Sequence, residues 1–291
     1  MAASRMEIAR GDIVECFGKL GKRVLARADI ERVVAENRGF WRLARATTVR
    51  EFIEFMLEKT DLRAAKFGFP STTITRYTWG TPSVYELALS LKPEAYFTHY
   101  SAMYLHELTL QVPKTVYLNC EQPPKAKQGT QIDQRSIDVA FGRKPRKSGY
   151  VALYEGYRIC ILSGMHTSRL GVIEIKEPNG EVLQVTGIER TLIDIAVRPF
   201  YSGGVAEVLR AYQMARGRVS INKLAAMLKK AGYVYPYHQA IGFYLEKSGY
   251  KASQLDLLRK FPMSFDFYLT YEMGKDAAYS PDWHLHFPKG L

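Results

Sequence analysis

The chain has 291 residues, of which 47% are hydrophobic and 24% are charged, and its formal net charge at pH 7 is +12. This length allows two ordinary domains, and the hydrophobic share excludes disorder over most of the chain. No run of eighteen apolar residues exists to span a bilayer, and the first residues lack the apolar core of a signal peptide. We therefore expect a cytoplasmic protein, and the excess of Lys and Arg favours nucleic acid over a membrane as its partner.

Residues 1–27 predict a short leader helix followed by a basic arm. The arm places Lys22 and Arg23 among further cations around Gly18 and Gly21. A flexible basic arm beside a helical DNA-binding unit can follow the phosphate backbone or a minor groove. A solvated run of charge explains the same residues equally well.

Residues 28–80 have the layout of a winged helix-turn-helix, in which helices precede a two-stranded wing. Apolar residues at helical spacing predict a first helix over 28–37. A capping box of Thr48 and Glu51 predicts that the second helix covers 49–59. Residues 62–69 and 72–79 then predict two paired strands joined by a turn at Pro70 and Ser71.

Basic side chains of this unit gather at the start of the second helix and on the wing, whereas Glu54, Glu58 and Asp61 lie at the other end of that helix. Side chains at the start of a recognition helix reach base edges, and wing residues reach phosphates or the minor groove. This distribution favours DNA contacts over ordinary surface charge. The expected contacts are Arg42, Arg45, Thr47, Thr48 and Arg50 around the helix start, Arg63, Lys66 and Arg76 on the wing, and Lys22 and Arg23 in the arm.

Residues 80–82, Gly-Thr-Pro, form the best domain boundary, and residues 83–291 predict a larger mixed α/β domain. Ser83 caps a helix, Ser101 is expected to cap a short buried helix, and residues 116–120 predict a core strand. His99 and His106 have the chemistry of metal ligands or of a catalytic base, but we interpret them as structural histidines.

From Lys114 to Lys147 the chain is polar and basic, and Pro123, Pro124 and Gly129 predict a loop. The stretch from Lys125 to Lys147 is either a second contact with DNA or RNA or a solvated loop, with equal weight.

The rest of the chain predicts strands followed by helices. Residues 150–161 and 170–185 predict strands, with a hairpin turn at 177–180. A capping box of Thr186 and Glu189 is expected to open a helix, with Glu189, Arg190 and Asp194 as a structural ion-pair group. Two further helices are expected after Ser220 and Pro236, and His284 and His286 are expected to share one face of a strand, where we do not expect a metal.

Three blocks carry a resemblance to a known family: residues 96–108 (YFTHYSAMYLHEL), 185–194 (VTGIERTLID) and 201–209 (YSGGVAEVL), in this order after the winged unit. Together they resemble the AbiEi antitoxins of type IV toxin–antitoxin, or abortive-infection, systems. The resemblance implies a repressor that binds inverted repeats upstream of its own operon and opposes a nucleotidyltransferase-like toxin, which it need not contact. It implies that the larger domain carries the antitoxin activity. That domain can also hold two DNA-bound copies in register.

We expect no enzyme, cofactor or metal site here, but the alternative of a metal-dependent nuclease or an RNA-binding defence protein that uses Glu174 and Lys176 stays open. Glu174 and Lys176 have the acidic-x-Lys spacing of many metal-dependent nucleases, for which Asp138 would supply a second carboxylate. The chain lacks the Asp-x-Asp pair that the partner toxin needs and the Gly-rich phosphate loop of a P-loop enzyme. A plain interaction module with a degenerate winged helix is the third alternative.

Overall fold

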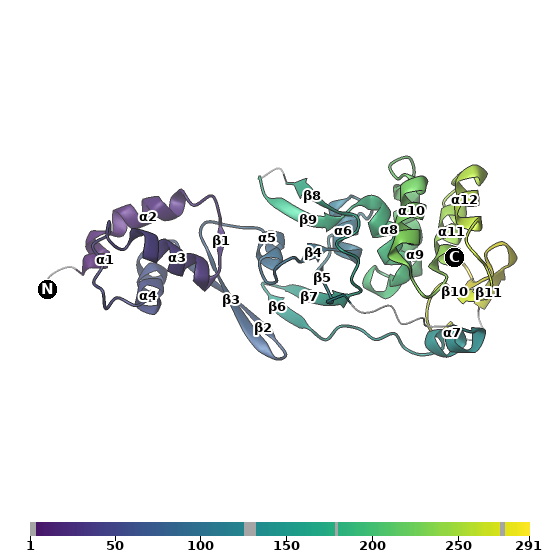
Figure 1. Cartoon of the computed structure of the whole chain (residues 1–291), viewed down its shortest axis with the longest axis horizontal. Helices are drawn as coiled ribbons and strands as arrows, with labels where there is room; N and C mark the ends of the chain where they lie inside the picture. The colour runs from purple at the N-terminus through teal and green to yellow at the C-terminus, as the bar shows by residue number, and fades with distance from the viewer. Residues whose placement is uncertain (1–3, 125–131, 178–179, 274–276) are drawn as a thin grey trace. The chain divides into compact units, whose positions relative to one another are not determined.

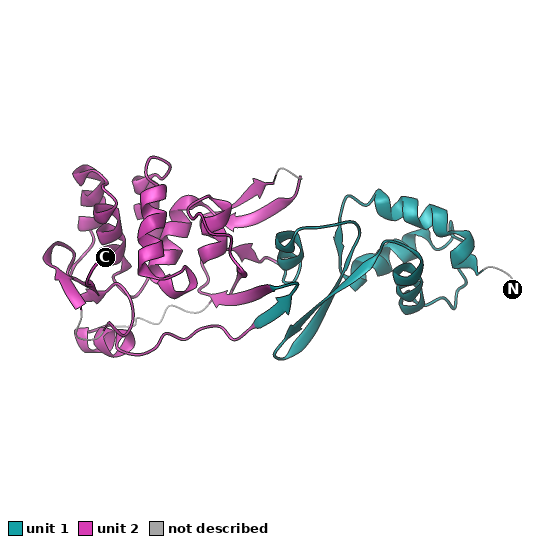
Figure 2. Cartoon of the chain, turned by 180° about the vertical axis from the view of Figure 1, so that it is seen from behind, with its two compact units in different colours: residues 1–93, 151–156 teal, residues 94–150, 157–291 magenta. Residues whose placement is uncertain are grey.

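The computed structural model describes residues 4–124, 132–177, 180–273 and 277–291 (Figure 1). The protein has a mixed α+β fold, as the sequence predicts. It divides into two compact units, which are residues 1–93 with 151–156 (unit 1) and residues 94–150 with 157–291 (unit 2), drawn in separate colours in Figure 2. Among the described residues, no helix has both the length and the apolar character needed to cross a membrane.

Unit 1 has the element order of a winged helix-turn-helix. Its helices and strands are α1 (Arg5–Ile8), α2 (Arg10–Gly18), β1 (Val24–Leu25), α3 (Arg27–Asn37), α4 (Val49–Lys59), β2 (Arg63–Phe69), β3 (Thr72–Thr78) and α5 (Val84–Leu89). The strands form an antiparallel sheet in the order β1-β3-β2. The two main helices and the wing therefore follow the sequence prediction closely.

The core of the winged unit includes the segment that the sequence predicts to be a leader. Ile13 and Phe17 of α2 are fully buried together with Ile30 of α3 and Phe52 of α4. The Phe17 ring stacks on the Phe52 ring with 6.2 Å between their centroids. Because α2 contributes to this core, we expect that its removal would expose the apolar faces of α3 and α4.

Unit 2 begins with α/β structure built on a six-stranded sheet in the order β6-β7-β5-β4-β9-β8. Its elements are β4 (Tyr96–Phe97), α6 (His99–Leu105), β5 (Thr115–Glu121), α7 (Gln134–Phe141), β7 (Tyr157–Gly164), β8 (Val172–Lys176) and β9 (Val182–Thr186), and the remaining strand of this sheet, β6 (Val151–Tyr154), falls among the residues of unit 1. β5 pairs with β7, and β4 with β9, in parallel, whereas the β4–β5 and β8–β9 pairs are antiparallel. β8 and β9 are the hairpin that the sequence predicts.

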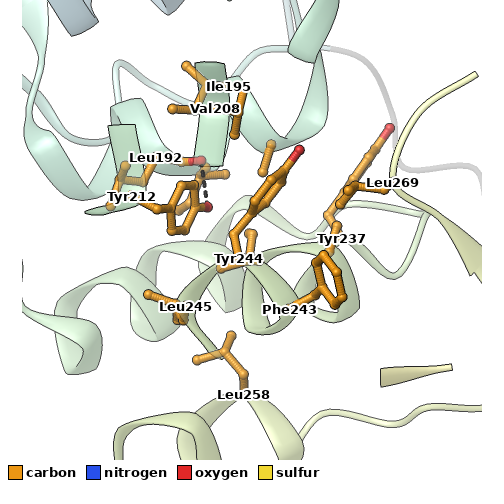
Figure 3. Close-up of a cluster of buried hydrophobic side chains, with 14 of the residues drawn as sticks. Leu192, Ile195, Val208, Tyr212, Tyr237, Phe243, Tyr244, Leu245, Leu258 and Leu269 are labelled. Carbon is orange, nitrogen blue, oxygen red and sulfur yellow. Dashed lines mark hydrogen bonds between the residues drawn. The ribbon is translucent and has the colours of Figure 1, made fainter. Parts of the chain in front are cut away.

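Helices and a small sheet complete unit 2. They are α8 (Ile188–Val197), η1 (Pro199–Tyr201), α9 (Val205–Met214), α10 (Ile221–Ala231), α11 (Tyr237–Lys247), α12 (Ala252–Arg259), β10 (Phe267–Tyr268), β11 (Ala277–Ser280), η3 (Pro281–Trp283) and β12 (Leu285–Pro288). Figure 3 shows how aromatic and aliphatic side chains of these helices fill one core. There the hydroxyl of fully buried Tyr212 donates a hydrogen bond of 2.9 Å to the Leu192 carbonyl oxygen, so the phenol is buried without losing its partner.

Two predicted helix caps are wrong. Ser101 lies inside α6, whose cap is Thr98, and its hydroxyl accepts the Tyr117 N–H of β5 instead. The predicted box of Thr186 and Glu189 does not form, because α8 starts after Gly187. The Thr186 hydroxyl meets Thr191, and Glu189 binds Lys223. Ser101 and Glu189 thus bond to residues of other elements instead of capping their own helices.

Two further predictions also need correction. The basic segment before Lys147 is not a continuous loop, because residues 134–141 form α7 with Asp133 as its cap. His284 and His286 do not share a strand face, because His284 has a left-handed backbone at the end of η3 and β12 begins at Leu285. His286 stacks on Tyr268 with ring centroids 5.0 Å apart.

Candidate nucleic-acid interface

The loop between α3 and α4 is fixed to the core by two buried side chains. Trp41 and Leu43 are 2% and 6% exposed, and the Trp41 ring stacks on Phe52 with centroids 5.7 Å apart and planes 11° apart. Arg42 stands between them with a left-handed φ of 50°, and it is exposed. A left-handed backbone is unfavourable for a side chain with a Cβ, so burial of both neighbours is what holds Arg42 outward.

Arg38 braces this loop from the end of α3. Its Nη1 donates to the Ala44 carbonyl oxygen at 2.7 Å and its Nη2 to the Thr47 carbonyl oxygen at 2.9 Å. Hydrogen bonds from a charged donor are stronger than neutral ones. Sequence reasoning missed Arg38, because its partners are backbone atoms of a loop whose shape the sequence does not predict.

The first turn of α4 is closed by the predicted capping box. The Thr48 hydroxyl accepts the Glu51 N–H at 3.2 Å, and the Glu51 carboxylate accepts the Thr48 N–H at 2.8 Å. The bonds from the Thr48 N–H and hydroxyl lower the pKa of Glu51. Thr48 and Arg50 are exposed, whereas Thr47 is half-buried.

The positive charges of α4 lie at its two ends, with Arg50 in the first turn and Lys59 in the last, where Lys59 lies 2.8 Å from Glu58. Arg50 Nε lies 2.8 Å from Glu54 Oε1, but both side chains are mostly exposed, so the pair is weak and can open. Glu51, Glu54 and Glu58 are also exposed. The cationic area is therefore the loop and the first turn, and we call Arg42, Arg45, Thr47, Thr48 and Arg50 the loop–helix surface.

The wing divides its predicted DNA contacts between two faces. In the hairpin register Ala65 pairs with Arg76 and Lys66 pairs with Thr75, so Lys66 and Arg76 lie on opposite faces. Lys66 is exposed, whereas Arg76 is half-buried on the face that carries buried Phe67. The Arg76 guanidinium donates to the Ser90 carbonyl oxygen at 2.7 and 3.1 Å.

Other predicted contacts have partners inside unit 1. Arg63 is exposed at the start of β2 and donates to the carbonyl oxygens of Thr60 and Leu62 at 3.1 Å. In the arm, Lys22 Nζ lies 2.7 Å from Asp29, and Arg23 lies 3.0 Å from Glu86. The five residues of the loop–helix surface thus follow one another along one loop and the first turn of α4. Lys22 and Arg23 of the arm pair with carboxylates, and Arg76 bonds to the Ser90 carbonyl oxygen.

The basic segment of unit 2 is exposed where it is described. Arg143, Lys144, Arg146 and Lys147 follow α7 and are exposed, as is Arg135 on α7 itself. Lys125 and Lys127 lie outside the described residues. The segment remains a second candidate for contact with a polyanion.

The residues of the nuclease alternative lie apart. Glu174 on β8 is exposed and accepts a hydrogen bond of 2.7 Å from Gln184. Asp138 on α7 accepts hydrogen bonds from Gln134 and from the Tyr268 hydroxyl. β8 and α7 are well separated within unit 2 in both Figure 1 and Figure 2. Asp138 is therefore not the second carboxylate beside Glu174.

Buried polar groups of unit 2 form a structural network, as predicted for Arg190, Asp194 and His99. Arg190 Nε lies 2.7 Å from Asp194 Oδ1, and both side chains are less than a tenth exposed. The Thr98 hydroxyl lies 3.0 Å from both Asp194 Oδ2 and His99 Nδ1. Burial lowers the pKa of His99 to about 4, so its imidazole is neutral at pH 7. His106 binds the Thr186 carbonyl oxygen.

No protein-family model matches the sequence, and no curated protein matches it significantly. A solved structure is similar: the crystal structure of the RV2827C protein from Mycobacterium tuberculosis, with a TM-score of 0.61 and 15% sequence identity. The similarity covers 98% of this chain and 93% of that chain. At this identity the similarity shows a shared fold over nearly the whole chain.

Proposed function

We propose that unit 1 binds double-stranded operator DNA through the loop–helix surface. Arg42 carries the proposal, because a strained, exposed arginine between two buried anchors is held in place for contact with a partner. Arg45, Thr48 and Arg50 extend the same surface onto the start of the second helix of a winged unit, the part of such a helix that enters a major groove.

The proposed role is that of an AbiEi-like repressor and antitoxin that regulates its own operon. The winged fold of unit 1 and the three resembling sequence blocks support it together. The proposed partners are inverted repeats upstream of the operon and a nucleotidyltransferase-like toxin encoded beside it, with no contact required between the two proteins. This role involves neither a cofactor nor a catalytic site.

Duplex binding tests the proposal directly. The full chain is titrated into fluorescent DNA from upstream of its own gene and into a scrambled duplex of the same length, without magnesium. We expect tighter binding to the upstream DNA and a steep loss of affinity as salt rises, because the complex releases counterions from the phosphates. Equal, weak binding of both duplexes would contradict operator recognition.

A further inference from the structure

Unit 2 contains a cleft of about 370 Å³ that has one aromatic wall. Its lining includes Tyr100 from α6, Tyr117 from β5, and Phe200 and Tyr201 from η1. The Tyr201 ring centroid lies 4.5 Å from that of Phe200 and 5.3 Å from that of Tyr117. The volume falls within the range of roughly 300–1,000 Å³ that is usual for small-molecule sites. Aromatic faces of this kind stack well against a planar ligand.

A buried carboxylate lines the same cleft. Glu207 of α9 is 8% exposed. Its Oε1 accepts hydrogen bonds from the Thr109 hydroxyl at 2.7 Å and the Tyr100 hydroxyl at 3.5 Å, and its Oε2 accepts one from Arg210 at 3.1 Å. Each carboxylate oxygen has two lone pairs, so Oε2 retains the capacity to accept an N–H from a ligand.

Cations and a close glycine complete the site. Lys114 lines the cleft and is exposed, and Lys147 Nζ lies 5.9 Å from the centroid of the Phe200 ring. Gly203 also lines the cleft, where a Cβ would lie within 3.0 Å of both Glu207 and Tyr100. Glycine therefore lets Glu207 and Tyr100 pack against the backbone at this wall of the cleft, where a Cβ would clash with both side chains.

We propose that this cleft binds a nucleotide. The base stacks on the aromatic wall, one of its N–H groups donates to Glu207, and its phosphate meets Lys114 and Lys147. An organic cation fits less well, because Arg210 already pairs with Glu207 and the two lysines repel a further positive charge. The nucleotide chemistry is the same for a free nucleotide and for one nucleotide of a single strand. The proposal rests on unit 2 alone and is independent of operator binding by unit 1.

Calorimetry on the full chain tests the proposal with the 5′-monophosphates of adenosine, guanosine, cytidine and uridine, the matching nucleosides, and short single-stranded oligonucleotides. Phe200→Ala should weaken binding by about tenfold, since stacking of one base contributes on the order of 1–3 kcal/mol. Tyr279→Ala removes an exposed aromatic ring from β11 and is the matched control, with unchanged affinity. Circular dichroism confirms that both variants are folded.

The Lys114→Ala variant distinguishes the contribution of the phosphate to binding from the contribution of the base. It should lower the affinity for a monophosphate and leave the affinity for its nucleoside unchanged. Binding of monophosphates identifies a free nucleotide, and binding of oligonucleotides alone identifies a single strand, provided that Phe200→Ala weakens either one. The proposal is overturned if neither binds, if folded Phe200→Ala binds like the unmodified chain, or if spermidine binds the cleft in their place.

Discussion

The Arg38 guanidinium lies 2.9 Å from the carbonyl oxygen of Thr47, so the end of α3 is tied to the residue before the cap of α4. A second bond to Ala44 makes Arg38 the brace of the intervening loop. Arg42 and Arg45 lie within the braced segment. The position of the two exposed arginines therefore depends on a third one that is half-buried and turned inward.

Arg38→Ala should weaken both the fold of unit 1 and its binding of DNA. Loss of two hydrogen bonds from a charged donor should lower the free energy of unfolding by about 2–3 kcal/mol. Urea denaturation and duplex titration measure the two effects. Arg32→Ala removes a mostly exposed arginine of α3 and should change the stability little. Equal stability of Arg38→Ala and Arg32→Ala would show that the brace is unimportant.

Arg42→Gly should separate folding from function. Glycine adopts a φ of 50° without strain, whereas Arg42→Ala keeps the strain and loses the charge. Both variants should bind duplex DNA more weakly, yet the glycine variant should be more stable than the alanine variant by about 1 kcal/mol. Thermal or urea unfolding beside DNA titration gives both quantities. If either variant binds DNA as tightly as the original chain, Arg42 has no role in binding.

Two ion pairs of similar geometry should differ greatly in their contribution to stability. Arg190 and Asp194 are 2.7 Å apart and buried, whereas Arg50 and Glu54 are 2.8 Å apart and mostly exposed, both at a spacing of four residues. Asp194→Ala leaves a buried guanidinium without its carboxylate and should lower the free energy of unfolding by about 3–5 kcal/mol. Glu54→Ala should lower it by less than about 0.5 kcal/mol. Similar losses in urea denaturation would refute a structural role for the buried pair.

Stability should fall as pH drops from 6.5 toward 4. The pKa of His99 is about 4 in the folded protein and 6.5 in a solvated chain, so in this interval only the unfolded state takes up the proton. The difference corresponds to at most about 3 kcal/mol, present at neutral pH and lost on acidification. Asparagine tolerates the left-handed backbone, so His99→Asn should reduce the slope of the dependence between pH 7 and pH 5, measured by urea unfolding. The slope that remains includes His238, because burial lowers the pKa of that side chain to about 4 as well. His166→Asn is the half-exposed control, and a slope unchanged by His99→Asn would contradict burial of the neutral imidazole.

Helix caps and apolar spacing in the sequence predict those helices whose ends and buried faces depend on nearby residues. The capping box of Thr48 and Glu51 and the apolar spacing behind it predicted α4 with its observed bounds. Ser220 and Gly232 likewise enclose α10, with Gly232 in the left-handed conformation expected of a helix end. The two-residue β1 carries no periodic signal, and it forms because β3 offers it a partner.

The candidate sites could be predicted less well, because their geometry depends on contacts between residues that are far apart in the sequence. A two-residue turn at residues 70–71 fixes the register of the hairpin, and in that register Arg76 lies on the same face as Phe67 and Phe69. The alternation of side chains along the two strands could therefore have predicted that Arg76 and Lys66 lie on opposite faces of the wing. The bracing of the loop by Arg38 has no comparable signal. The aromatic cleft joins residues about a hundred positions apart, such as Tyr100 and Phe200, which only the fold brings together.

The salt dependence of operator binding tests the role of the loop–helix surface most directly. The double variant Arg42→Ala/Arg45→Ala is compared with Lys229→Ala/Lys230→Ala, which removes the same charge from exposed lysines at the end of α10 in unit 2. Each lost phosphate contact reduces the slope of log affinity against log salt by about 1. We predict a slope reduced by up to about 2 and weaker binding for the first variant, with little change for the second. Equal changes in both variants, or a change in the second alone, would contradict DNA binding by the loop–helix surface.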